Sequence, residues 1–201
     1  MKKTKIISND TITVAILLVI LMTSSFCGNR DENSTIDKGQ SPVSKTTTKP
    51  PIMDIHTAVV LGDIEAIQQH IKAGSDLNII EPAGGSSPLI SATVLGKTEI
   101  AKALIEAGAD VNYQNYQGST ALISAAFFCR TEIVEALLDN GADITLRNNY
   151  GHTALESISA PFDQVKGIYD QVGKDLGPLG LKLDYDHIER TRPRIAEMLQ
   201  R

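Results

Sequence analysis

Residues 118–125 read Gly-Ser-Thr-Ala-Leu-Ile-Ser-Ala, and residues 85–92 read Gly-Ser-Ser-Pro-Leu-Ile-Ser-Ala. A shorter copy, Gly-His-Thr-Ala-Leu, occupies residues 151–155. The copies start at residues 85, 118 and 151, so the period is 33 residues. A fixed period of this length indicates a repeat protein, in which short units of one structure stack on each other.

The second half of each unit repeats as well. Thr-Glu-Ile at residues 98–100 recurs at 131–133, and Gly-Ala-Asp at residues 108–110 recurs at 141–143. An earlier copy spans residues 55–78 and lies 34 residues ahead of the next one. Because two motifs keep a fixed offset from each other, the pattern indicates a repeated unit rather than a chance run of helical sequence.

These residues together resemble the ankyrin repeat, whose pattern runs from Gly and Thr-Pro-Leu-His through Glu-Ile/Val-Val to Gly-Ala-Asp-Val-Asn. The resemblance covers residues 52 to about 160 and extends loosely to the C-terminus. It implies an all-α solenoid of about four helix-turn-helix repeats, with a C-terminal helical insertion or cap. The expected repeats are residues 52–84, 85–117, 118–150 and 151–201.

Local signals agree with paired helices. Ser87 and Thr120 are residue types that cap helix N-termini, and each precedes the first helix of its pair. Thr98 and Thr131 are expected to cap the second helices in the same way. Each unit can bury its apolar faces only against its neighbours, so the stability of the domain comes from stacking.

The fourth unit departs from the pattern after Ile158, where the glycine expected between the two helices is absent. Residues 161–191 are predicted to form an inserted helix and loop, with apolar side chains at helical spacing from Val165 to Val172. A second helix is expected from about Arg194. The insertion has two interpretations: it covers the exposed end of the stack, or it forms a second binding surface.

Residues 1–27 have the layout of an export signal. Lysines precede an apolar run at residues 12–22, which is shorter than the roughly 20 residues that span a bilayer. The following residues resemble the end of a bacterial lipoprotein signal, which implies lipidation at Cys27, although Ser24 and Phe26 depart from that pattern. Simple cleavage nearby and an uncleaved signal anchor are the alternatives.

Residues 28–51 are rich in Ser, Thr, Lys, Asp and Pro, and almost nothing in them is apolar. Such a segment cannot bury enough surface to offset the entropy of folding, so it is expected to be a disordered linker. The protein is therefore expected to be exported to a bacterial cell envelope, either free in the periplasm or held at a membrane by its N-terminus.

The sequence carries no recognised catalytic or metal-binding pattern, and its four histidines are scattered. No cofactor is expected. The net charge of −5 argues against a nucleic-acid surface, which needs clustered Lys and Arg. Cys129 stands where Gly62 and Gly96 stand in the earlier repeats, and is expected to be a tolerated replacement, with a reactive thiol as the alternative.

The resemblance implies a protein-binding surface made of loop tips and the exposed side of the first helices. The last two residues of each first helix are apolar, and they are expected to form an exposed stripe. The alternative is that the stripe packs between repeats or under the insertion. The predicted binding residues are Val94, Leu95, Tyr116, Gln117, Phe127, Phe128, Arg147, Asn149 and Tyr150.

These observations predict a non-catalytic protein-binding module of the cell envelope that holds one partner in its concave face. An inhibitor or immunity protein that neutralises an envelope enzyme or toxin is the alternative. An unrecognised enzyme within the C-terminal insertion is a third hypothesis, although that segment shows no nucleophile–base pattern.

Overall fold

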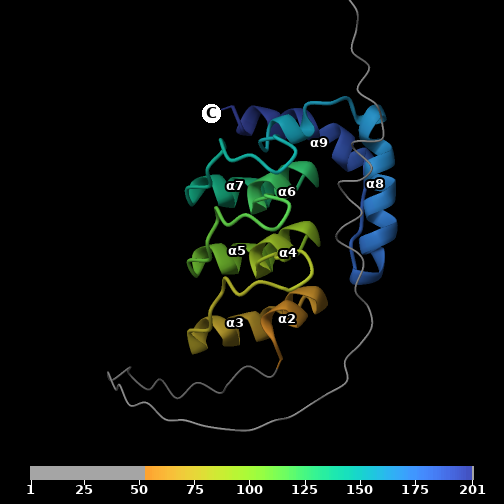
Figure 1. The fold of residues 1–201 in the computed structure, drawn as a ribbon. Helices are drawn as coiled ribbons and strands as arrows, with labels where there is room; N and C mark the ends of the chain where they lie inside the picture. The colour runs from red at the N-terminus through yellow and green to blue at the C-terminus, as the bar shows by residue number, and fades with distance from the viewer. Residues whose placement is uncertain (1–52, 201) are drawn as a thin grey trace, which may run out of the picture.

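The computed structural model describes residues 53–200, and within that range the chain is helical with no strand. The helices come in antiparallel pairs that stack in one direction (Figure 1). The predicted export signal, Cys27 and the whole predicted linker lie outside the described residues. The three regular pairs are α2 (Ile55–Leu61) with α3 (Ile64–Ala73), α4 (Pro88–Val94) with α5 (Thr98–Glu106), and α6 (Ala121–Phe127) with α7 (Thr131–Asp139).

Side-chain caps begin the first helices, as the sequence predicts. Ser87 accepts a hydrogen bond from the backbone N–H of Ile90 at the start of α4, and Thr120 caps α6 in the same way. The prediction that Thr98 and Thr131 cap the second helices is wrong. Both threonines are already the first helical residues, and the cap positions before them are held by basic residues that make no side-chain cap.

The turn inside each pair requires a left-handed backbone. Gly62 and Gly96 adopt φ of 76° and 67° there, and Cys129 adopts φ of 52°. A Cβ on Gly96 would lie 2.7 Å from Cζ of Arg130, so the guanidinium of the next repeat would have to move to admit one. The side chain of Cys129 packs against the C-terminal helices, beside Tyr169 and Ile188. This turn therefore accommodates a Cβ in spite of its left-handed backbone.

The core is continuous, because helices pack against each other within each pair and between successive pairs. The second helices α3, α5 and α7 contact each other in series, and so do the first helices α2, α4 and α6. Leucines of these helices, such as Leu89, Leu104 and Leu137, are fully buried at the contacts. The prediction of an all-α repeat solenoid is therefore confirmed.

The C-terminal part replaces a regular fourth pair. Its first helix is reduced to the 3-10 turn η2 (Glu156–Ile158), and its second helix is α9 (Tyr185–Met198), which packs against α7. Between them come α8 (Phe162–Leu176) and the 3-10 turn η3 (Gly177–Leu179). α9 begins earlier than the predicted start near Arg194, because the Asp184 carboxylate caps it by accepting from the backbone N–H of His187.

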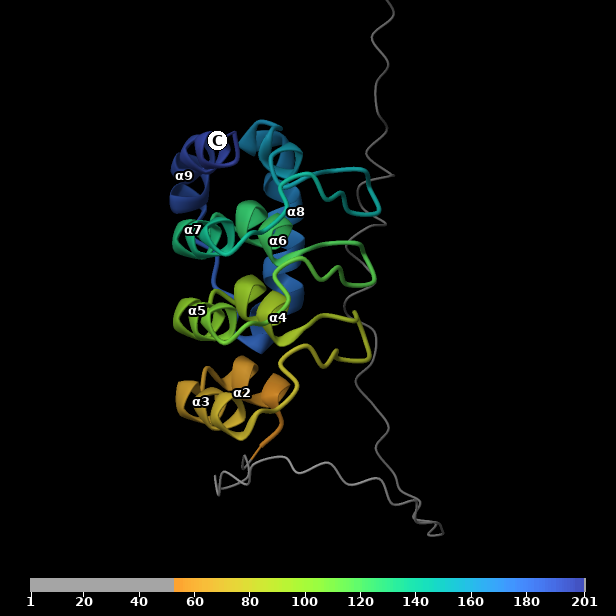
Figure 2. The same cartoon turned by 90° about the vertical axis from the view of Figure 1, so that its left-hand side faces the viewer.

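Helix α8 runs along the side of the stack, past α6 and α4, and the chain then returns to α9 at the end of the stack (Figures 1 and 2). No helix within residues 53–200 is both long and apolar enough to cross a membrane.

Candidate protein-binding surface

Helix α8 covers most of the apolar stripe at the ends of the first helices. Leu61, Leu95 and Phe128 hold equivalent places in three successive repeats, and we call them the apolar row. Their exposed fractions are 66%, 9% and 6%. Val172 and Leu176 of α8 pack on Leu95 and Phe128. Only Leu61, beyond the end of α8, stays open to solvent.

The prediction of an exposed stripe at Val94, Leu95, Phe127 and Phe128 is therefore wrong. Leu95 and Phe128 are buried, and Val94 and Phe127 are partly buried against the same cluster. The alternative interpretation, in which the stripe packs under the insertion, is confirmed. Apolar side chains at helical spacing in the insertion predict that α8 has a buried face, but they do not identify the surface that buries it.

A buried arginine joins α8 to the rest of the stack. Arg192 of α9 is 6% exposed, and its Nη1 donates to the Tyr169 hydroxyl of α8 over 2.9 Å. Its Nη2 donates to the carbonyl oxygens of Ile158 (2.8 Å) and Ala160 (2.6 Å). The Tyr169 hydroxyl donates in turn to the carbonyl of Phe127 over 2.6 Å, and the two rings stack 4.6 Å apart. The sequence does not reveal this network, because its members are far apart in the chain.

The loops between repeats project together to one side of the stack, and we call their ends the loop tips (Figure 2). One side chain closes the turn at each tip. Asn115 accepts from the backbone N–H groups of Gln117 and Ser119, and Asn148 does the same for residues 150 and 152. Glu81 takes this role in the first loop. The tips are therefore held in shape before any partner binds.

Hydrogen bonds also connect each tip to the next. The backbone N–H of Tyr116 donates to the carbonyl of Gly84, and that of Asn149 donates to the carbonyl of Gln117. The Asn149 side-chain amide donates to the carbonyl of Tyr116 over 2.9 Å. Gln117 is partly buried in this ladder. Asn149 and Gln117, both predicted to bind a partner, thus join neighbouring tips to each other.

The two predicted tip tyrosines remain accessible. Tyr116 is 56% exposed and Tyr150 is 47% exposed. The ring of Tyr116 lies over Gly85, where a Cβ would meet it at 2.4 Å, so one face of the ring is supported. A supported, half-exposed ring loses little conformational freedom when a partner covers it.

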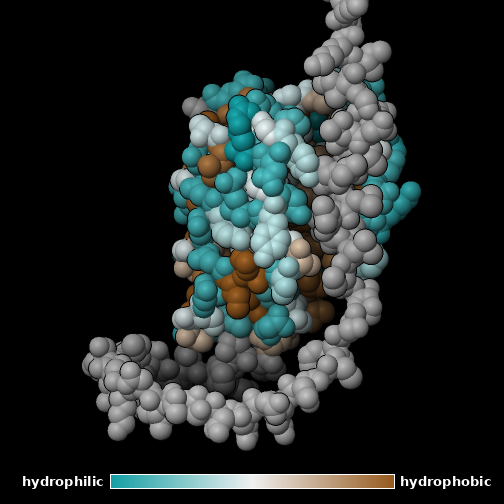
Figure 3. All heavy atoms as spheres, viewed as in Figure 1, coloured by the Kyte–Doolittle hydropathy of each residue, from teal (hydrophilic) through white to brown (hydrophobic). Residues whose placement is uncertain are grey.

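Two exposed residues of the first loop were not predicted. Ile79 is 51% exposed and Ile80 is 40% exposed, and both belong to the loop between α3 and α4. Hydrophobic surface is visible low on the face in Figure 3, at the level of the first two repeats. Glu81 closes its turn as Asn115 and Asn148 close theirs, so Ile80, one residue earlier, corresponds to Gln114 and Arg147 of the later loops. We define the loop-tip surface as Ile79, Ile80, Tyr116 and Tyr150.

The family model for ankyrin repeats in three copies matches residues 55–148. Residues 55–148 are ankyrin repeats. The ankyrin repeat domain of Bcl-3, described as a unique member of the IkappaB protein family, is a similar solved structure, with 34% sequence identity and a TM-score of 0.50. The match covers 51% of this chain and 45% of that one. No curated protein matches the sequence.

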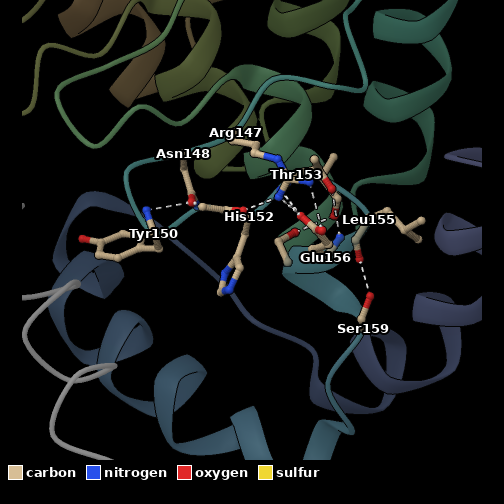
Figure 4. Close-up of polar contacts among 11 residues, drawn as sticks. Arg147, Asn148, Tyr150, His152, Thr153, Leu155, Glu156 and Ser159 are labelled. Atoms are coloured by element: carbon tan, nitrogen blue, oxygen red, sulfur yellow. Dashed lines mark hydrogen bonds and ion pairs between the residues drawn. The ribbon is translucent and has the colours of Figure 1, made fainter. Parts of the chain in front are cut away.

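The last ankyrin loop is anchored by a carboxylate (Figure 4). Glu156 accepts from the backbone N–H of Thr153 over 2.8 Å, and its own N–H donates to the Thr153 hydroxyl over 3.3 Å. Arg147 forms a two-pronged ion pair with the same carboxylate, at 2.6 and 3.2 Å, and also donates to the carbonyl of Gly151. Arg147, another predicted binding residue, is therefore already paired within the chain.

We expect this contact to make the stability of the folded protein depend on pH in the acid range. The Thr153 N–H and then Arg147 lower the pKa of the Glu156 carboxyl from 4.5 to about 2. The pKa of Glu156 is lower in the folded protein than in the unfolded chain. The stabilisation by the Glu156 carboxylate is therefore complete above pH 4.5 and is lost as the pH falls toward 2. Urea midpoints at pH 6 and pH 3 should therefore differ less in Glu156→Gln than in the wild type. An equal difference would contradict the assignment, and Glu99→Gln controls for the loss of one exposed charge.

Metal-binding clusters and the Cys129 thiol are the remaining features of the stack that could carry chemistry. No group of three or more His, Cys, Asp and Glu side chains that could hold a metal ion occurs within residues 53–200. Cys129 is 1% exposed, and burial raises the pKa of its thiol to about 11. A buried thiol with a raised pKa is a poor nucleophile, which favours the tolerated replacement over the reactive thiol.

Proposed function

We propose that this ankyrin protein is a non-catalytic binding module of the cell envelope that docks a protein partner on its loop-tip surface. The observation that carries the proposal is the contrast between two apolar regions. Most of the predicted helix stripe is covered by α8, whereas Tyr116, Ile79 and Ile80 stay exposed on loops held by internal hydrogen bonds. Exposed aromatic and aliphatic side chains on a rigid support are typical of binding hot spots.

The loop tips also indicate which kind of side chain contacts the partner. Arg147 is paired with Glu156 and Asn149 bonds to the next tip, so the polar groups of the tips are largely engaged within the chain. The loop-tip surface adds exposed aliphatic and phenolic groups to these engaged polar ones. We infer that the partner presents an apolar segment to the tips, with its polar groups at the rim of the contact.

The envelope location rests on the N-terminal sequence alone. The lysines before the apolar run at residues 12–22 and the small residues that follow favour export. Mass measurement of the mature N-terminus tests this part. A chain starting at or near Cys27, with or without added lipid mass, would support export, and an intact Met1 in a cytosolic fraction would overturn it.

Site-specific photocrosslinking tests the binding surface. A photoreactive amino acid placed at Tyr116 of the full chain, expressed in its own cells, should crosslink one distinct protein. The same amino acid at Glu99, which is exposed on α5 away from the loop tips, is the matched control and should not. Once that protein is identified, Tyr116→Ala with Ile80→Ala should weaken its binding at least tenfold without changing the helical circular dichroism. Equal crosslinking from both positions would overturn the proposal.

A further inference from the structure

A cavity of about 450 Å³ lies at the C-terminal end of the stack, between α9 and the chain that leads from η2 into α8. In a regular fourth unit the first helix would lie 33 positions after α6, over residues 154–160, but only η2 forms there. The cavity is lined by the residues where this helix is cut short, from Ile158 to Phe162. Its volume falls in the range of small-molecule sites, roughly 300–1,000 Å³.

Most of the cavity wall is apolar. One side comes from the shortened unit and the start of α8, and the other side comes from one face of α9. The hydroxyl of Ser159, which also lines the cavity, already donates to the carbonyl of Leu155 over 2.8 Å (Figure 4). The apolar residues of the wall are Leu155, Ile158, Pro161, Phe162, Pro193 and Ala196. This wall suits a small ligand with an apolar body.

The buried guanidinium of Arg192 also lines the cavity, and it has no counter-charge. Its three hydrogen bonds go to the Tyr169 hydroxyl and to the carbonyl oxygens of Ile158 and Ala160, which are all uncharged. A guanidinium carries five N–H donors, so at least two of them are unused. Among the described residues Arg192 forms no ion pair. Because a buried charge is costly without an opposite charge, a carboxylate is the group that Arg192 would bind best.

Glu189 brings a negative charge to the same cavity. It lies three residues before Arg192 on α9, so the two side chains start from neighbouring positions on the helix surface. They do not pair with each other, because Arg192 turns inward to Tyr169. Pro193 has no N–H and cannot donate the helical hydrogen bond to the backbone carbonyl of Glu189. The carboxylate and this carbonyl are therefore two acceptors that suit a cation.

We propose that this cavity binds a free apolar α-amino acid, whose carboxylate accepts from Arg192, whose ammonium donates to Glu189 and whose side chain lies on the apolar wall. An α-amino acid carries its two charged groups on one carbon atom, which matches two opposite charges one helical turn apart. A ligand with a single charge would leave either Arg192 or Glu189 without a counter-charge. This site is separate from the loop-tip surface and does not depend on it.

Isothermal titration calorimetry on the full chain tests the ligand class, with L-phenylalanine as the probe. We expect L-phenylalanine to bind. Its analogue without the ammonium group (3-phenylpropanoate) and its analogue without the carboxylate (2-phenylethylamine) should each bind at least tenfold more weakly. The two analogues test the contacts to Glu189 and Arg192 without altering the fold. Absence of L-phenylalanine binding, or equal affinity for either analogue, would overturn the proposal.

A substitution at the rim tests the location of the site. Glu189→Gln should weaken L-phenylalanine binding at least tenfold and leave the helical circular dichroism unchanged, because Glu189 is exposed. Glu197→Gln is the matched control, since Glu197 is exposed on the same helix and does not line the cavity. In nuclear magnetic resonance spectra, L-phenylalanine should shift amides of residues 155–162 and 189–200 and leave those of α2 and α3 in place.

Two results of these measurements would contradict the site. Equal binding by Glu189→Gln and the wild type would remove Glu189 from it. The same amide shifts, produced by raising the concentration of the chain alone, would mean that a second copy occupies this end of the stack, and would also overturn the proposal.

Discussion

Replacing Arg192 by alanine is expected to lower the free energy of unfolding of the C-terminal part of the stack by about 3 kcal/mol. The guanidinium donates to one hydroxyl and two carbonyl oxygens while it is 6% exposed. Its removal leaves the carbonyls of Ile158 and Ala160 without these donors and opens a space beside Tyr169. Urea denaturation followed by circular dichroism measures the loss.

The effect should also be local. In a repeat protein each unit contacts mainly its neighbours, so damage at one end need not spread to the other. Amides of α8 and α9 should lose protection in hydrogen exchange, whereas those of α2 and α3 should keep theirs. Arg190→Ala is the control, because Arg190 is exposed on the same helix and bonds only to the carbonyl of Asp186. If both variants were equally stable, the hydrogen bonds of Arg192 would not be what holds α8 and α9 on the C-terminal end of the stack.

Replacing Leu104 by alanine is expected to destabilise the whole stack by about 3–4 kcal/mol. Leu104 lies in α5, which contacts both α3 and α7, and its side chain is completely buried. The substitution removes apolar area and leaves a cavity at the centre of the array, where neighbouring helices cannot close without losing other contacts. The shift in the urea midpoint, at unchanged slope, measures the effect.

Leu61→Ala provides the matched control for this prediction. The same chemical change at a leucine that is 66% exposed should alter the free energy of unfolding by less than about 0.5 kcal/mol. A loss at Leu61 comparable with that at Leu104 would mean that Leu61 is buried in solution, and would contradict the exposure of this end of the apolar row.

The regular part of the fold was predictable because its determinants are close together in the chain. Ser87 caps a helix through an N–H three residues away, and the 33-residue period repeats every contact between neighbouring units. Thr98 and Thr131 were misassigned by one position. Threonine favours the N-cap position, but this preference does not show whether the residue before it is the N-cap instead, as it is in both helices.

The candidate site was predicted only in part. Exposure of Tyr116 and Tyr150 follows from their place at loop tips. The engagement of Arg147 with Glu156 and of Asn149 with Tyr116 does not, because a polar side chain at a tip can face solvent, a partner or the chain itself. Exposure of Ile79 and Ile80 was not predicted, because an aliphatic side chain in a loop can pack on the chain or face solvent, and spacing does not choose between the two.

The sequence by itself determined the repeat architecture, most of the first-helix caps and the amphipathic character of α8, since each depends on short-range spacing. Only the tertiary structure decided where α8 lies. A helix with an apolar face must be covered, but several surfaces of similar hydrophobicity could cover it, and spacing cannot choose among them. The choice is made by contacts such as those from Arg192 to Tyr169 and Ile158, which join residues 23 and 34 positions apart. The same contacts turn the predicted exposed stripe into a covered one, with Leu61 alone left open.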